Sequence, residues 1–149
     1  MNQTTSNTWL TNNFRLAELT RTSCGLPNVP NQAQTDNLKH LATNYLQPLR
    51  DRYGPIRINS GFRTPEVNKA VGGAKNSAHM QGNAADIYVP SALLACLYVS
   101  FFHERYVKEG IGYDQLIVSY RRSTGNWWLH LGIASQSSYN RMQVKFLTY

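Results

Sequence analysis

The sequence predicts an α+β fold in which helices pack on a small, largely antiparallel sheet. Two segments, 31–53 and 91–109, space their apolar residues as amphipathic helices do. Two β-favouring segments, 113–120 and 127–133, follow each other with a short polar turn between them, which is typical of an antiparallel hairpin. Long helices beside a sheet built from hairpins are the elements of the α+β class.

The length of the chain, 149 residues, allows one domain with a core of its own. Residues 1–13 are rich in Asn and Thr, and we expect them to form a flexible N-terminal lead. Residues 14–149 then form the single folded domain, and no internal repeat divides them. Cys24 and Cys96 are too few and too far apart for a disulfide scaffold, so we expect two reduced thiols.

The first half of the domain begins with a short helical turn at 14–19 and a loop at 20–30. Asn31 is suited to cap the next helix, with Gln34 at the capping-box position. The apolar residues at helical spacing that would face the core are Leu38, Leu41, Tyr45 and Leu49. Pro48 removes one backbone hydrogen bond from this helix, which predicts a bend.

Three further elements lead to the middle of the chain. Residues 56–59 alternate as a strand, and Thr64 then caps a short helix with a proline in its first turn. Residues 86–89 form an apolar strand that the next proline ends. Ser91 caps the long helix to Glu109. The side chains that we expect on its inner face are Leu94, Leu97, Phe101 and Arg105, with Leu93 and Tyr98 beside them.

The register of the hairpin follows from pairing Tyr120 with Trp127 across the turn. Ser119 then opposes Trp128, and Ile117 opposes His130. Because side chains alternate along a strand, one face of the hairpin presents Ile117, Ser119, Trp128 and His130.

The segment 77–86, Ser-Ala-His-Met-Gln-Gly-Asn-Ala-Ala-Asp, is the feature around which the chain is organised. Its small residues let the backbone fold back, so that His79 and Asp86 can meet across a loop that leads into a strand. An imidazole and a carboxylate are two of the three protein ligands that a catalytic zinc usually has, and His130 is the candidate third ligand. A surface pair, or a core histidine bonded to a carboxylate, is the alternative that these residues alone leave open.

The pattern Ser-x-His-x-x-Gly-x-Ala-x-Asp, followed downstream by Trp-x-His, resembles the zinc-binding signature of the M15 family of cell-wall peptidases. That family includes D-alanyl-D-alanine carboxypeptidases, vancomycin-resistance dipeptidases and phage endolysins, and hedgehog signalling domains hold zinc in the same arrangement. The resemblance implies a Zn²⁺ ion held by His79, Asp86 and His130 on the predicted sheet. It also implies a hydrolase that cleaves peptide bonds in peptidoglycan stem peptides, as a carboxypeptidase or an endopeptidase.

Other motifs extend the resemblance over nearly the whole chain after Phe14. Ser-Gly-Phe-Arg-Thr resembles the family motif ahead of the first histidine, which implies that Arg63 holds substrate oxygens in the active site. By the same resemblance Ser77 binds substrate, and we add Trp128 from the face of His130. Asp-Gln-Leu-Ile at 114–117 and the closing Asn-Arg-x-Gln are similar to the small endolysin-like subfamily.

One part of the family pattern is missing. Many members carry a glutamate five residues after the Asp of the Asp-Gln motif, and others an acid three residues before the last histidine. Those positions are Ser119 and Trp127 here. Among the eight acids, Asp114 is the candidate general base by elimination. Simple alternation places it on the face opposite His130, but it stands at the start of the strand, where twist or a bulge can redirect it. Two hypotheses therefore stand: a zinc peptidase, and a zinc-holding cell-wall-binding or virion protein without turnover.

The net charge of +7 suits an anionic partner, either nucleic acid or an anionic wall polymer. The basic residues are scattered singly apart from Arg121-Arg122, so we expect no nucleic-acid partner, and no run of the chain is long and apolar enough for membrane insertion. The polar amino terminus lacks the features of a secretory signal. We expect a monomer in the cytoplasm of the producing cell, acting on the wall after phage-type release, or a virion-associated protein.

Overall fold

A five-stranded sheet in the order β1-β2-β4-β3-β5 forms the centre of the computed structural model, which describes residues 7–135 and 138–149. Every neighbouring pair of strands is antiparallel except β3 and β5, which are parallel. The strands are β1 (Ile58–Ser60), β2 (Ala84–Val89), β3 (Gln115–Arg121), β4 (Asn126–Gly132) and β5 (Gln143–Thr148). With its helices, this sheet confirms the predicted α+β class.

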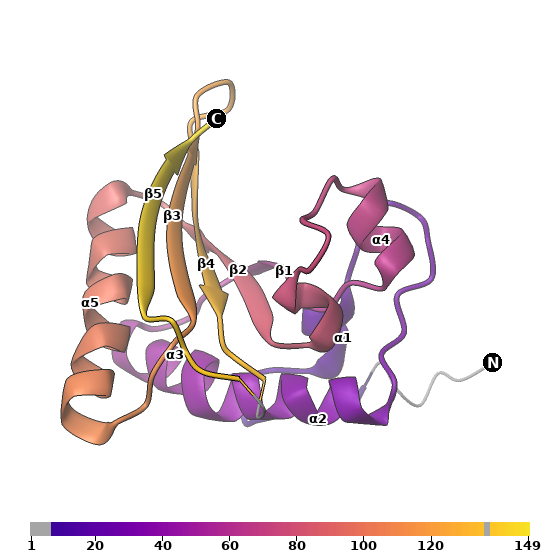
Figure 1. The fold of residues 1–149 in the computed structure, drawn as a ribbon, viewed down its shortest axis with the longest axis horizontal. Helices are drawn as coiled ribbons and strands as arrows, with labels where there is room; N and C mark the ends of the chain where they lie inside the picture. The colour runs from indigo at the N-terminus through magenta and orange to yellow at the C-terminus, as the bar shows by residue number, and fades with distance from the viewer. Residues whose placement is uncertain (1–6, 136–137) are drawn as a thin grey trace.

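The helices lie on one face and around one end of the sheet (Figure 1). They are α1 (Leu16–Thr20), α2 (Gln32–Leu41), the π-helical η1 (Ala42–Leu46), α3 (Gln47–Tyr53), α4 (Pro65–Ala70), the 3₁₀ turn η2 (Ala78–Gln81) and α5 (Ala92–Glu109). Helix α5 packs across β2, β3 and β4, while α1, α4 and η2 gather near β1 and the start of β2. Across the described ranges, none of the helices combines the length and apolar character that a bilayer crossing requires.

The core between α5 and the sheet explains which side chains of the helix are buried. Leu116, Val118, Leu129 and Leu131 point into this core from β3 and β4. From α5 they meet Ala95, Tyr98 and Phe102. The predicted face is right in part: Tyr98 is buried, and Leu94 and Phe101 pack against the core, but Leu97 is 41% exposed and Leu93 is 72% exposed. The helix is apolar over a wide arc, and the small Ala95, rather than a leucine, lies where the helix packs against the core.

The bend predicted at Pro48 takes the form of a widened turn, η1, directly ahead of the proline. The backbone N–H of Gln47 donates to the carbonyl of Ala42, five residues back. Because Pro48 has no N–H, it leaves the carbonyl of Asn44 without its helical donor, and the guanidinium of Arg105 on α5 donates there instead. This contact joins α5 to the rod formed by α2, η1 and α3.

The predicted lead at 1–13 extends too far into the domain. Residues 1–6 lie outside the described residues, but Leu10 is only 6% exposed and belongs to the core. The hydroxyl of Thr11 donates to the side chain of Gln47 at 2.7 Å, and the backbone of Leu16 donates to Thr8. The packed part of the chain therefore begins ahead of residue 14.

The hairpin register is confirmed. Tyr120 pairs with Trp127, Ser119 with Trp128 and Ile117 with His130. These pairs place Ser119, Trp128 and His130 on the face of the sheet away from α5, where the site described next is found. Strand β5, which the sequence did not predict, pairs with β3 at the open edge and extends this face.

Candidate metal centre

The turn that carries the first histidine is held by its own residues. Ser77 caps η2, because its hydroxyl oxygen accepts a hydrogen bond from the backbone N–H of His79 at 3.3 Å. Gly82 ends the turn with φ 75°, and a Cβ atom there would lie 2.6 Å from the backbone oxygen of Gln34 on α2. Only glycine satisfies both conditions, so the turn packs closely on α2 and holds His79 at 2% exposure.

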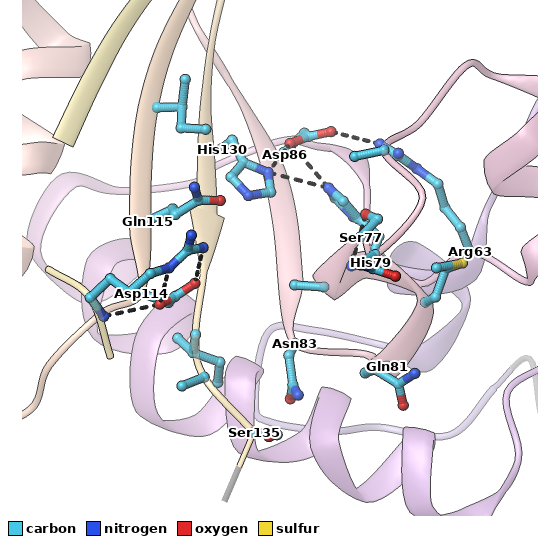
Figure 2. Close-up of a pocket in the computed structure, with 18 of the residues that line it drawn as sticks. Arg63, Ser77, His79, Gln81, Asn83, Asp86, Asp114, Gln115, His130 and Ser135 are labelled. Atoms are coloured by element: carbon cyan, nitrogen blue, oxygen red, sulfur yellow. Dashed lines mark hydrogen bonds and ion pairs between the residues drawn. The ribbon is translucent and has the colours of Figure 1, made fainter. Parts of the chain in front are cut away.

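Three side chains converge at the start of β2 (Figure 2). The register of the sheet pairs Asp86 on β2 with His130 on β4, which places Nδ1 of His130 2.9 Å from Oδ1 of Asp86. Nε2 of His79 lies 3.3 Å from Nδ1 of His130 and 3.4 Å from Oδ1 of Asp86. Ligands at roughly 2.0–2.1 Å from a tetrahedral zinc are about 3.3 Å apart, so this triangle fits one such ion. The fourth coordination position remains for water or substrate.

The tautomer of His79 is fixed by a hydrogen bond on the side of the ring that faces away from the triangle. Its Nδ1 lies 2.6 Å from the carbonyl oxygen of Gly61, so Nδ1–H donates there and Nε2 is the ring nitrogen that faces the triangle. Gly61 itself packs closely on α1, because a Cβ atom at that position would lie 2.4 Å from the backbone oxygen of Leu19. The Ser-Gly-Phe-Arg motif thus supports the candidate ligand through its backbone as well as through its arginine.

Asp86 is held in its ionised form. Burial raises the pKa of this carboxyl, but the charges and hydrogen bonds of His79 and His130 outweigh burial and hold the pKa well below its usual range. Nη2 of Arg63 binds the second oxygen, Oδ2, at 2.9 Å. Oδ1 therefore faces the histidines while Oδ2 is fixed by the guanidinium.

Arg63 lines the site but is more engaged than the sequence predicted. Its Nε donates to Oγ of Ser60 at 2.9 Å, and its Nη1 lies 3.4 Å from Oδ1 of Asn68. Counting the bond to Asp86, three of the five guanidinium N–H groups of Arg63 have acceptors among the described residues. The Arg63 side chain is 14% exposed. The structure thus shows Arg63 orienting a candidate metal ligand, and its contact with substrate stays a prediction.

A cleft of about 750 Å³ opens in front of the triangle, on the sheet face away from α5. Ser77 and Trp128, the other predicted substrate-binding residues, both line it. The sequence missed Leu147 and Tyr149, which reach the cleft because β5 pairs with β3. The β-favouring residues 144–147 are the signal from which that strand was predictable.

No acid occupies the family positions for a general base. Ser119 lines the cleft at 2% exposure, while the ring of Trp127 packs on Tyr120 with centroids 4.4 Å apart. All eight acids of the chain lie in the described residues, and of these Asp86 and Asp114 line the cleft. Asp114 is therefore the carboxylate left to consider.

Asp114 lines the cleft, so redirection at the start of the strand, and not simple alternation, describes its side chain. It lies in a bend before β3, where the period-two rule does not hold, and its side chain reaches the wall of the cleft (Figure 2). Both of its oxygens bind Arg141, with Oδ2 2.6 Å from Nη2 and Oδ1 2.9 Å from Nε. These hydrogen bonds lower the pKa of Asp114, which makes it a poor proton acceptor.

Two histidines and an aspartate that are close enough to hold one metal ion, in the lining of a cleft, are the donor set of a metal-binding protein. The sequence model of the peptidase M15 family matches residues 12–116, and the chain belongs to that family. The candidate ligand His130 lies beyond the matched residues, and the sheet register is what brings it to the site.

A similar protein is the zinc D-Ala-D-Ala carboxypeptidase of Streptomyces albus G, 42% identical over 78 residues. The matched part covers 50% of this chain and 31% of that relative, so the match spans about a third of the relative's length.

Proposed function

We propose that the chain is a zinc-dependent peptidase that cleaves peptide bonds in peptidoglycan stem peptides. The observation that carries this proposal is the triangle of His79, Asp86 and His130, sized for one zinc ion and open to a cleft. Membership of the M15 family and the similarity to a D-Ala-D-Ala carboxypeptidase support the choice of substrate.

Bound zinc supplies a Lewis acid and lowers the pKa of a coordinated water. Residues of the chain orient the metal ligands and bind the peptide. Gly61 holds the imidazole of His79 in its ligating tautomer, and Arg63 holds the carboxylate of Asp86. Arg63 also has N–H groups that no acceptor in the described residues engages. These groups are donors for the oxygen of the scissile carbonyl. Trp128 and Ile117 give the cleft an apolar wall for the peptide.

Proton transfer is the weakest part of this site. The hydroxyl of Ser119 is no base at neutral pH, and Asp114 is bound to Arg141. A positioned general acid or base commonly contributes roughly 10²–10⁴-fold to a rate. We therefore infer slow, metal-dependent hydrolysis, slower than in relatives that carry a glutamate where Ser119 stands.

The buried Ser119 also favours a second candidate function, a zinc-holding wall-binding or virion protein without turnover. In that case the metal and the cleft serve binding alone. The two candidates differ in one observable, which is the release of peptide products from the wall.

The proposed subfamily and place of action rest on the resemblance of residues 114–117 and of the closing residues to the endolysin-like subfamily. On that basis we propose an endolysin-like monomer that acts on the wall after release from the producing cell, or from a virion. Peptidoglycan is its proposed partner, and neither nucleic acid nor membrane insertion has a part in this function.

Zinc analysis combined with mapping of muropeptides from purified sacculi tests the proposal. We expect zinc-loaded protein to release peptide fragments, and the His79→Ala variant to release none. The identity of the fragments reports a carboxypeptidase or an endopeptidase. Stable zinc binding without any change in the muropeptides would instead support the non-catalytic function.

A further inference from the structure

Asp114 and Arg141 form an ion pair in the wall of the cleft that the proposed reaction does not use. Oδ1 of Asp114 accepts the backbone N–H of Arg141 at 3.0 Å and its Nε at 2.9 Å, and Oδ2 accepts Nη2 at 2.6 Å. The backbone of Asp114 is fixed as well, by Gly132 on one side at 2.8 Å and Gln143 on the other at 3.0 Å. The carboxylate is thus a rigid anchor that holds the guanidinium in one orientation.

The outer edge of that guanidinium faces the cleft. Within residues 7–135 and 138–149, no acceptor engages Nη1 of Arg141, and its side chain is 56% exposed while that of Asp114 is 16% exposed. Arg141 lines the same cleft as the three candidate metal ligands. A planar guanidinium held at one edge by a carboxylate presents its other edge to a second planar anion, since both Nη atoms carry N–H groups pointing away from the first.

The two arginines of the cleft have different surroundings. Asp114 and Arg63 lie on either side of His130 and Asp86 in Figure 2. Arg63 is 14% exposed and bonded to a candidate metal ligand, so it acts next to the reacting bond. Arg141 has its partner outside the triangle and is open to solvent, so it acts on a group elsewhere in the substrate.

We propose that Arg141 is a specificity-determining residue that binds a free carboxylate of the stem peptide, and that Asp114 is the positioning residue that holds it. The inference rests on the proposed function, because it takes peptide as the ligand of the cleft. Peptide stems carry carboxylates at their acidic residues and at their C-terminus, and each becomes neutral when it is amidated. The guanidinium distinguishes the two forms, because an amide has one acceptor oxygen and no charge.

The test uses pairs of synthetic stem peptides that differ at one carboxylate, present as the acid or as the amide. The zinc-loaded full chain is assayed for kcat and KM on each peptide, and for the Kd of each peptide by calorimetry. We expect wild type to prefer the acid in one pair by roughly 10- to 100-fold, the effect of one charge-assisted pair. Arg141→Gln should bring this ratio close to one, and Arg141→Lys, which keeps the charge but not the fork, should restore part of it.

Arg52→Gln is the matched control for loss of charge. Arg52 is an exposed arginine on α3 that does not line the cleft, so the preference for the acid should persist. Asp114→Asn separates two roles: a positioning role raises KM for the acid peptide alone, whereas a general base would lower kcat on acid and amide alike. Melting temperatures of all variants exclude unfolding as the cause.

The proposal is overturned if wild type shows no preference in any pair, or if Arg141→Gln keeps the wild-type ratio. Absence of hydrolysis by wild type would defeat the proposed peptidase function, but the calorimetric ratios would still decide the role of Arg141. If Asp114→Asn lowers kcat on both forms, Asp114 is the base, and its assignment as a positioning residue fails.

Discussion

The two sides of the cleft are built in different ways. On one side, η2, β2 and β4 bring together His79, Asp86 and His130, with His79 buried and the side chains of His79 and Asp86 each held by a hydrogen bond from outside the triangle. On the other side, the segments before β3 and before β5 contribute Asp114 and Arg141, which bind each other, and Arg141 is 56% exposed. Both sides depend on pairing between strands, but the metal-binding side is the more buried at His79, and the outer side offers an exposed guanidinium.

The two sides suit different tasks. A metal site needs ligand atoms fixed within a few tenths of an ångström, which the packed turn η2 and the paired strands β2 and β4 supply. Selection among substrates needs exposed donors at the cleft wall, and these can vary without disturbing the metal.

Replacing either histidine of the metal-binding side should remove the metal. We expect His79→Ala and His130→Ala to lose zinc on dialysis, because two ligands alone do not retain the ion, and to show no hydrolysis. His40→Ala and His103→Ala are the controls, since these side chains bond to Asn44 and Tyr113 away from the site. Metal content by mass spectrometry measures the effect, and equal zinc in all four variants would show that the site is elsewhere.

The next largest change in activity is expected from supplying the missing general base. Ser119→Glu should raise kcat by roughly 10²-fold, because position 119 lies on the face of His130 and lines the cleft. The variant should also melt at a lower temperature, since its carboxylate replaces a side chain that is 2% exposed.

Ser119→Gln is the control of the same size without a carboxylate, and it should not accelerate the reaction. Hydrolysis of sacculi at matched zinc occupancy measures the change. Brisk turnover of wild type that neither Ser119→Glu nor Asp114→Asn alters would mean that another group moves the proton.

A smaller loss is expected for the arginine behind Asp86. Arg63→Ala should lower kcat/KM by roughly 10- to 100-fold, the usual cost of losing a partner that orients a metal ligand. Its melting temperature should change little by comparison. Arg57→Ala, which removes an exposed arginine stacked on Tyr88, serves as control. Unchanged turnover, or a melting temperature that falls in step with activity, would make Arg63 a purely structural residue.

The sequence pointed to the metal-binding side through its motifs. The segment 77–86 and the resemblance to the M15 zinc signature named His79, Asp86 and His130, whereas the pairing of β2 with β4 that sets Asp86 opposite His130 was not predicted. That these three residues ligate zinc in solution remains the prediction tested above. The sequence also predicted the capping box of Asn31 with Gln34 and the caps at Thr64 and Ser91, which are local hydrogen bonds.

The outer side was not predictable in the same way. Arg141 meets Asp114 only because β5 pairs in parallel with β3, a contact between segments that are distant in sequence. The direction of Asp114 stayed open at the sequence level, because alternation applies within a strand and this residue lies in the bend before one. The buried face of α5 was predicted only in part, since the sheet selects Tyr98 and Phe102 from an arc that is apolar almost throughout.

The central claim is that one zinc ion is held by His79, Asp86 and His130. Anomalous diffraction at the zinc edge, on crystals of protein with measured metal content, tests it most directly. The account predicts one ion per chain, with Nε2 of His79, Nδ1 of His130 and Oδ1 of Asp86 each at about 2.0–2.2 Å from it. An ion coordinated by other side chains, or well-ordered crystals of zinc-saturated protein with no anomalous peak between these three residues, would contradict it.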